Sequence, residues 1–132
     1  MPSTESVWRE MRAWLVQSTT TMATGSVLEV GPAGADDDLA DSAQIHRLRA
    51  GTYLVRLSRR RMDIPMLADY SVPARALDRW HHDGRFPDCT DGYLFTRSHE
   101  VIADICVAWF RDRCGVAGSG DLGFGYTVPC PG

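Results

Sequence analysis

The sequence predicts an α+β domain in which helices cover one face of an antiparallel sheet of about four to five strands. Apolar residues recur at helical spacing near the start of the chain and again over residues 98–114, whereas residues 52–60 and 62–68 have the period-two pattern of strands. Strands grouped together in sequence, with helices before and after them, are typical of a sheet with segregated helices. We expect one domain over residues 1–132.

The chain begins with a predicted helix over residues 4–18. Val7, Met11, Trp14 and Leu15 form its apolar stripe, and Trp8 lies beside that stripe. A run of three threonines and a glycine ends this helix, and the apolar residues 26–30 predict a strand. Residues 31–41 are rich in glycine and aspartate, which predicts an acidic loop.

Three further strands are expected at 43–49, 52–60 and 62–68, joined by short connections as an antiparallel meander. Ile45 is the clearest inward residue of the first. In the second, Tyr53, Val55 and Leu57 share one face, and Thr52, Leu54, Arg56 and Ser58 share the other.

The second half of the chain predicts two helices and a last strand. Pro73 opens a short helix that continues past Trp80 to Gly84, and residues 86–95 are expected to be irregular. Ser98 is the expected N-cap of a long helix that ends at Gly115. The buried stripe of the long helix is expected to comprise Val101, Ile105, Ala108 and Trp109. A strand over 122–128 and a flexible tail over 129–132 complete the chain.

Composition disfavours several classes of protein. The net charge of −3 is unlike the basic footprint of a nucleic-acid binder, although all 14 basic residues are arginine. No apolar run approaches the roughly 18 residues of a membrane span, and the N-terminus lacks the pattern of a signal peptide. We therefore expect a cytoplasmic protein.

No motif predicts catalysis, a cofactor or a metal. The G-x-G-x-x-G of Gly118, Gly120 and Gly123 follows a helix, whereas a dinucleotide fingerprint follows a strand. His81 and His82 point about 100° apart on the expected helix, so they are poorly placed to share zinc with Cys89.

The remaining polar and thiol groups are also interpreted as structural. The aspartates of residues 36–41 lack calcium-loop spacing. His99 beside Glu100 is the one acid-base pair that deserves inspection. Cys106 and Cys114 lie too far apart on one helix to form a disulfide, and pairing of Cys89 with Cys130 stays open.

The most suggestive surface group is the set of arginines at the end of the second meander strand, comprising Arg56, Arg59, Arg60 and Arg61. Guanidinium groups clustered in this way suit a carboxylate-rich peptide or a phosphate. Charges at this place equally protect an edge strand from aggregation. Both interpretations remain open.

The order of these segments resembles the type III secretion chaperone-like proteins, including the YbjN and actinobacterial TY-Chap families. The resemblance comprises GTYLVRLS around Tyr53, a tryptophan (Trp80) near Pro87, the Gly115-Val116 step after a long helix, and LGFGYTV at residues 122–128. The sequence departs from that pattern at HHDGR and in its acidic loop.

The resemblance implies a non-enzymatic module that forms a homodimer or hetero-complex and holds a partner polypeptide. Tyr53, Arg56, Arg59, Arg60, Arg61 and Trp80 are then the candidate partner-binding residues. Related subunits suggest a second role, as an accessory subunit that binds precursor peptide, kinase or lyase in ribosomal-peptide modification. A small metal protein or enzyme using His81, His82, His99 and Cys89 is the third alternative.

Overall fold

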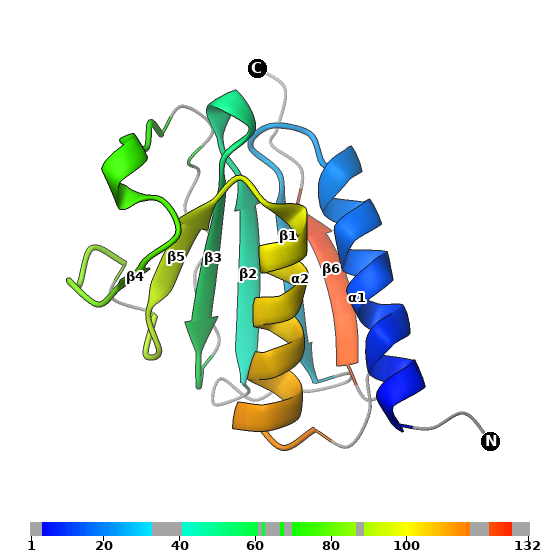
Figure 1. The fold of residues 1–132 in the computed structure, drawn as a ribbon. Helices are drawn as coiled ribbons and strands as arrows, with labels where there is room; N and C mark the ends of the chain where they lie inside the picture. The colour runs from blue at the N-terminus through cyan, green and yellow to red at the C-terminus, as the bar shows by residue number, and fades with distance from the viewer. Residues whose placement is uncertain are drawn as a thin grey trace.

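A computed structural model of the chain describes residues 4–32, 41–60, 62, 67, 70–86, 89–116 and 122–127. Within these ranges the chain forms two α-helices and a six-stranded antiparallel sheet (Figure 1). The predicted α+β class is therefore confirmed, whereas four to five strands and three helices were expected. The differences lie in residues 62–68 and 73–96, described below.

The six strands follow the order β4-β5-β3-β2-β1-β6 across the sheet. All five strand pairings are antiparallel. The two helices lie on the same side of the sheet, with α2 in front of its middle and α1 along its β6 border (Figure 1). The strands are β1 (Val27–Pro32), β2 (Ser42–Arg47), β3 (Tyr53–Ser58), β4 (Trp80–His81), β5 (Tyr93–Thr96) and β6 (Leu122–Thr127).

Helix α1 (Thr4–Thr21) buries Trp8, Met11 and Leu15, which lie on one line along the helix at three- and four-residue spacing. Trp14, which was expected in the buried stripe, is instead 40% exposed. The indole of Trp14 lies at the side of that line and packs against Phe124 of β6, with 4.5 Å between the ring centroids. The buried stripe therefore includes Trp8 in place of Trp14.

Of the predicted meander, the strands expected at 43–49 and 52–60 are present as the antiparallel pair β2 and β3, and the side-chain faces of β3 are as expected. The strand expected at 26–30 is present as β1 and pairs with β2. Ile45 of β2 lies opposite Val55 of β3, and both are fully buried beneath the helices. Leu54 packs on the opposite face of the sheet. Most of the strand expected at 62–68 lies outside the described residues, and Met62 and Leu67 belong to no strand.

The helix expected from Pro73 to Gly84 is wrong. A single 3₁₀ turn, Ala74–Ala76, is followed by extended chain that pairs with β5. Asp78 has a φ of 59° and its N–H donates to the carbonyl of Phe95 at 2.7 Å. This left-handed residue ends any helical path and directs the chain into β4.

Residues 93–96, which were expected to be irregular, form β5 between β3 and β4. All four side chains of this strand are buried. Tyr93 and Phe95 join Leu48, Leu54 and Phe86 in a second apolar cluster on the face opposite the helices. A strand buried on both faces has no polar alternation, so its sequence lacked the period-two pattern that marks a strand.

Helix α2 (His99–Val107) begins where predicted, because the Ser98 hydroxyl accepts a hydrogen bond from the Val101 N–H at 3.2 Å. The helix continues as a π-helical segment, Ala108–Arg113, and ends at Gly115 with a φ of 69°. The expected buried stripe of this helix is wrong except at Trp109, because the buried residues lie next to the expected ones in sequence. The buried residues are Ile102, Ala103, Cys106, Val107, Trp109 and Phe110.

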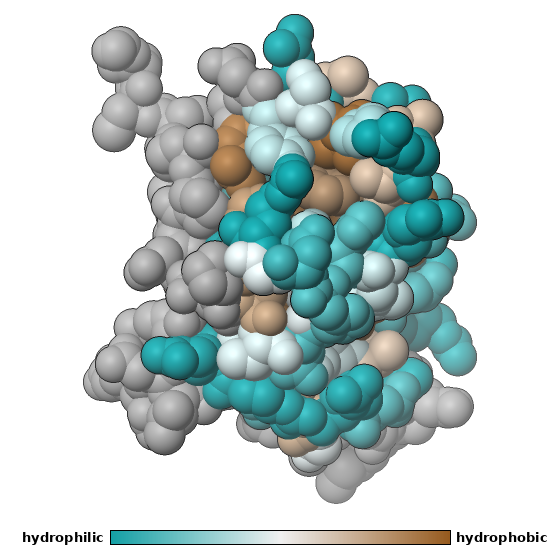
Figure 2. Space-filling view, turned by 90° about the vertical axis from the view of Figure 1, so that its left-hand side faces the viewer, coloured by the Kyte–Doolittle hydropathy of each residue, from teal (hydrophilic) through white to brown (hydrophobic). Residues whose placement is uncertain are grey.

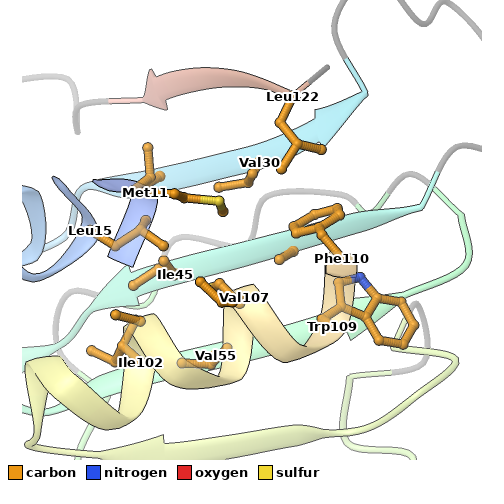
Figure 3. Close-up of a cluster of buried hydrophobic side chains, with 14 of the residues drawn as sticks. Met11, Leu15, Val30, Ile45, Val55, Ile102, Val107, Trp109, Phe110 and Leu122 are labelled. Carbon is orange, nitrogen blue, oxygen red and sulfur yellow. The ribbon is translucent and has the colours of Figure 1, made fainter. Parts of the chain in front are cut away.

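The main core lies between the helices and the sheet (Figure 3). Met11 and Leu15 of α1 and Ile102 and Val107 of α2 point toward Val30, Ile45 and Val55 of the sheet. Two clusters, one on each face, leave the middle strands β2 and β3 buried on both sides. Because α2 packs on the sheet and β4 is a strand of it, the sheet fixes the position of α2 relative to β4. The candidate site lies between these two elements.

Candidate functional site

A groove of about 480 Å³ separates the C-terminal half of α2 from β4 and the end of β3. Figure 2 looks onto this side of the molecule, where hydrophobic surface shows between hydrophilic residues. The sheet and the loops beside it contribute Leu57, Trp80, His82 and Asp91 to the lining. The helix contributes Asp104, Ile105, Ala108, Trp109 and Arg113.

The register of β4 directs Trp80 toward the helices. Trp80 lies opposite Leu94 of β5, whereas its neighbour His81 lies opposite Tyr93 and stacks on that ring on the other face. Asp78 holds the start of this segment, because its carboxylate also accepts a hydrogen bond from the Thr96 hydroxyl at 2.8 Å. Trp80 forms a wall of the groove while remaining 43% exposed.

Trp109 forms the opposite wall and is held by two arginines. The guanidinium carbon of Arg59 lies 4.8 Å from the ring centroid of Trp109, and that of Arg113 lies 6.0 Å away. Contacts at these distances have the geometry of cation–π interactions. The indole therefore has a fixed orientation at one end of the groove.

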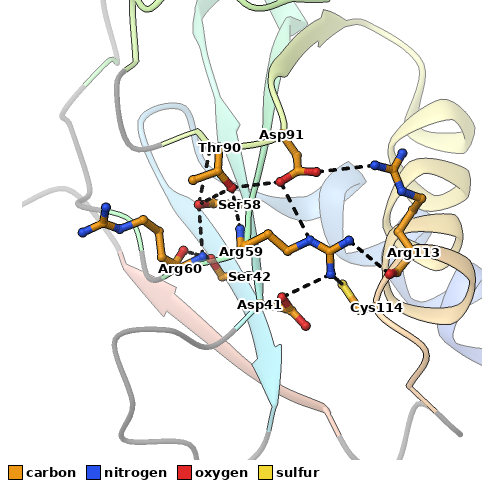
Figure 4. Close-up of polar contacts among 9 residues, drawn as sticks. All are labelled: Asp41, Ser42, Ser58, Arg59, Arg60, Thr90, Asp91, Arg113 and Cys114. Atoms are coloured by element: carbon orange, nitrogen blue, oxygen red, sulfur yellow. Dashed lines mark hydrogen bonds and ion pairs between the residues drawn. The ribbon is translucent and has the colours of Figure 1, made fainter.

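The same arginines join the ends of β3 and α2 (Figure 4). Arg59 donates to the carbonyl of Arg113 at 3.2 Å and lies 3.6 Å from the Asp41 carboxylate. Asp91 bridges the two guanidiniums, at 4.0 Å from Arg59 and 3.5 Å from Arg113. The charges at this end of the groove thus have partners within the chain.

The other charged residue of the lining, Asp104, also has a partner. Its carboxylate lies 2.6 Å from the guanidinium of Arg12 on α1, with both side chains in solvent. The hydrogen bond and charge of Asp104 raise the pKa of Arg12. The rest of the lining comprises Leu57, Trp80, His82, Ile105, Ala108 and Trp109, so the groove is mainly apolar.

The candidate partner-binding residues are not all on the surface. Tyr53 is buried, and its hydroxyl donates to the Thr19 carbonyl at 2.5 Å. Arg56 is only 2% exposed; it donates to Gln44 at 2.6 Å and to Cys89 Sγ at 3.1 Å. The expectation that Arg56 belongs to a surface group is therefore wrong, because the face of β3 that it occupies is covered.

The remaining members of that set have different settings. Arg59 belongs to the network around Trp109, Arg60 is exposed, and Arg61 lies outside the described residues. Trp80 lines the groove. Arg56 and Arg59 thus belong to different networks, and whether Arg59, Arg60 or Trp80 contacts a partner stays a prediction.

Sequence reasoning missed the groove's helical wall. The helical pattern predicts Trp109 only as a member of the buried stripe, and it predicts no role for Asp91 or Arg113. One signal was present: Asp104 is the only charged residue between Val101 and Phe110, so it marks the outer side of α2. Its neighbours Ile105 and Ala108 lie close to that side and line the groove.

The histidine and cysteine candidates lie in two separate places. His81, His82 and Cys89 surround a small pocket of about 180 Å³, and the His81 ring nitrogen contacts the Ala76 carbonyl at 3.0 Å. The described residues contain no group of three His, Cys, Asp or Glu side chains that could hold a metal ion. His99 contacts the Thr19 hydroxyl at 3.0 Å and packs edge-on to Tyr53, while Glu100 is exposed.

The thiols on and after α2 are poorly ionised. Burial raises the pKa of Cys106 to about 12, and burial followed by the charge of Asp41 raises that of Cys114 to about 12. Cys130, Gly118, Gly120 and residues 36–38 lie outside the described residues, while Gly123 is part of β6. The Cys89–Cys130 pairing therefore stays open.

Comparison with the models of known protein families, with curated proteins and with solved structures gave no match. In the part of the chain that the structure describes, no helix has the length and apolar character to cross a membrane.

Proposed function

We propose that this chain is a non-enzymatic module that binds a partner polypeptide in the groove between α2 and β4. The observation that carries the proposal is Trp80, a large aromatic side chain that is 43% exposed and lines an apolar groove. Tryptophan is among the residues that most often dominate the energy of protein interfaces. The partner would place apolar side chains against Trp80 and the α2 wall.

The shape and charge of the groove favour a polypeptide over a small molecule. Sites for small molecules enclose most of the ligand surface. Here one wall stands on a two-residue strand at the border of the described sheet and is largely open to solvent. A mainly apolar lining that also includes internally paired charges, such as Asp91 with Arg113, has the composition of a protein interface.

The type III secretion chaperone-like fold and a cytoplasmic location belong to the same proposal. The order of helix, meander, helix and final strand supports the chaperone-like fold. Proteins of that kind are expected to hold a segment of a partner on a sheet-and-helix surface. In this chain the surface would be the groove, and the contribution of Tyr53 and Arg56 would be to support the sheet from within.

Selection of binders from a random peptide library, followed by titration of the selected peptides, tests the proposal. We expect peptides with an aromatic or aliphatic anchor, and Trp80→Ala should weaken their binding at least tenfold, which corresponds to about 1.4 kcal/mol. Trp14→Ala is the matched control, because Trp14 is similarly exposed but packs against β6 at the other border of the sheet.

The control should bind the selected peptides as the unaltered protein does. Failure to select any peptide, or peptides that bind the Trp80→Ala variant with full affinity, would contradict the assignment of the groove.

A further inference from the structure

The two borders of the described sheet differ in ways that concern self-association. The β4 border is only two residues long, Trp80–His81. The β6 border runs for six residues, Leu122–Thr127, and contains no charged residue and no proline. Exposed edges are usually protected by charge, proline or short length, and β6 has none of these.

Exposed aromatic side chains gather along the same border. The described residues expose four large hydrophobic side chains, and three of these belong to β6 or to the helix beside it. Trp14 is 40% exposed, Phe124 39% and Tyr126 51%. Phe124 and Tyr126 lie on the helix side of β6, where Phe124 contacts Trp14. Helix α1 lies along this border (Figure 1).

We propose that this border binds a second copy of the chain, with the two β6 strands antiparallel and the sheets continuous across a twofold axis. Residues opposite each other in an antiparallel pair lie on the same face of the sheet, and in one strand only residues an even number of positions apart share a face. The twofold axis therefore passes through one residue and its copy, and not between two residues. We place it at Gly125. Phe124 then lies opposite Tyr126 of the second copy, and the reverse pair forms symmetrically.

Three features favour a second copy over an unrelated strand. The strand is uncharged, so pairing with itself brings no like charges together. Glycine at the axis allows close approach: a Cβ added at Gly125 would meet no atom within 4 Å, and its φ is not in the left-handed region. A second copy also brings its own three aromatics to the same face, which a short peptide strand does not.

The buried area is consistent with this arrangement. The exposed fractions of the three aromatics amount to roughly 250 Å² per chain, if each side chain offers about 200 Å². A standard interface buries about 800 Å² per partner. The aromatics would supply about a third of that area, and the strand edge and the outer side of α1 would supply the rest.

Gly125 provides a clean variant, because a side chain at this position meets open space within one chain. We expect the unaltered protein to have the mass of a dimer by light scattering, over concentrations from about 1 to 100 μM. Gly125→Lys should be monomeric, because it places two ammonium groups face to face at the axis. Gly125→Ala should remain dimeric, and circular dichroism should show all three folded alike.

A cysteine at the same position tests the register. Opposed Cα atoms in an antiparallel pair lie about 4.5–5.5 Å apart, which is within the range of a disulfide. Gly125→Cys should therefore form a disulfide-linked dimer, joined at residue 125 when its peptides are mapped by mass spectrometry. The Trp80→Ala variant should stay dimeric, since Trp80 belongs to the other border.

A monomeric unaltered protein at the highest concentration would overturn the proposal. So would a dimer that persists in Gly125→Lys or dissociates in Trp80→Ala, because the interface would then lie elsewhere. A dimer in which Gly125→Cys forms no link at residue 125 would refute the register.

Discussion

His46 of β2 gives the fold a specific sensitivity to acid. This side chain is 2% exposed, and its Nε2 lies 3.0 Å from Oε1 of Gln44. That oxygen also accepts from Arg56 at 2.6 Å, while the amide nitrogen of Gln44 donates to the Met62 carbonyl at 3.1 Å. Because the Gln44 oxygen can only accept, His46 Nε2 carries the hydrogen of this contact.

Burial, followed by the charge of Arg56, lowers the pKa of His46 from 6.5 to about 3. Between these two values the unfolded chain binds a proton at this residue and the folded chain does not. Acid therefore favours unfolding: the stability is fully present above pH 6.5 and falls as the pH drops toward 3. At about pH 5 the loss should be about 2 kcal/mol, since each unit below 6.5 costs about 1.4 kcal/mol.

Urea unfolding followed by tryptophan fluorescence at about pH 7 and pH 5 measures this loss. Other groups also titrate in this range, so the informative quantity is the difference between the unaltered protein and His46→Gln. Glutamine at position 46 keeps an N–H for Gln44 but does not titrate. The His46→Gln variant should therefore lack most of the loss of about 2 kcal/mol in stability between about pH 7 and pH 5. His82→Gln, which replaces an exposed histidine, is the matched control. Equal pH dependence of His46→Gln and the unaltered protein would refute the reasoning.

Two further predictions concern local structure. Ser98→Ala removes the acceptor of the Val101 N–H and should lower the free energy of unfolding by about 1 kcal/mol, measured by urea unfolding; Ser98→Thr should retain most of it. Gly92→Ala should cost about 2–3 kcal/mol, because Gly92 has a φ of 96° and an added Cβ would lie 2.6 Å from His82 Nε2. Gly84→Ala, with a φ of 77° but open space around it, should cost less; equal losses would show that the close contact is relieved.

The strands β1, β2 and β3 could be predicted from local sequence, and the pattern is most complete in β3. In β3, Tyr53, Val55 and Leu57 alternate with Leu54 and Arg56, so the residues of the two faces could be separated. The same pattern could not show that Arg56 is buried. The burial of Arg56 depends on Phe86 and Cys89, which are thirty or more residues away in sequence. Both lie with Arg56 on the face of the sheet that points away from the helices.

Residues 73–96 could not be predicted by local pattern. Pro73 followed by alanines is typical of a helix start, and a 3₁₀ turn does form there. The turn does not continue because Leu77 and Trp80 gain pairing with β5, and Tyr93 to Thr96 gain pairing with β3. These are tertiary contacts, which override weak local propensity.

The position of the candidate groove was partly predictable. Trp80 was identified from the sequence, but as part of a helix, and the α2 wall was missed. Nine of the ten residues from Val101 to Phe110 are apolar, so several adjacent stripes fit the helical period almost equally well. Asp104 was the one residue that could decide between them.

The π-helical segment Ala108–Arg113 makes the joint between α2 and β3 depend on a single amino-acid insertion. Cys114 donates to the carbonyl of Trp109 five residues earlier, at 2.8 Å, where a regular α-helix spans four. Deletion of one residue here would restore the regular helix but rotate everything after it by about 100°. Arg113 would then leave Asp91, and Arg59 would lose the carbonyl that it contacts. A chain without this extra residue could keep the same core, yet it would not keep the Trp109 wall fixed against the end of the sheet.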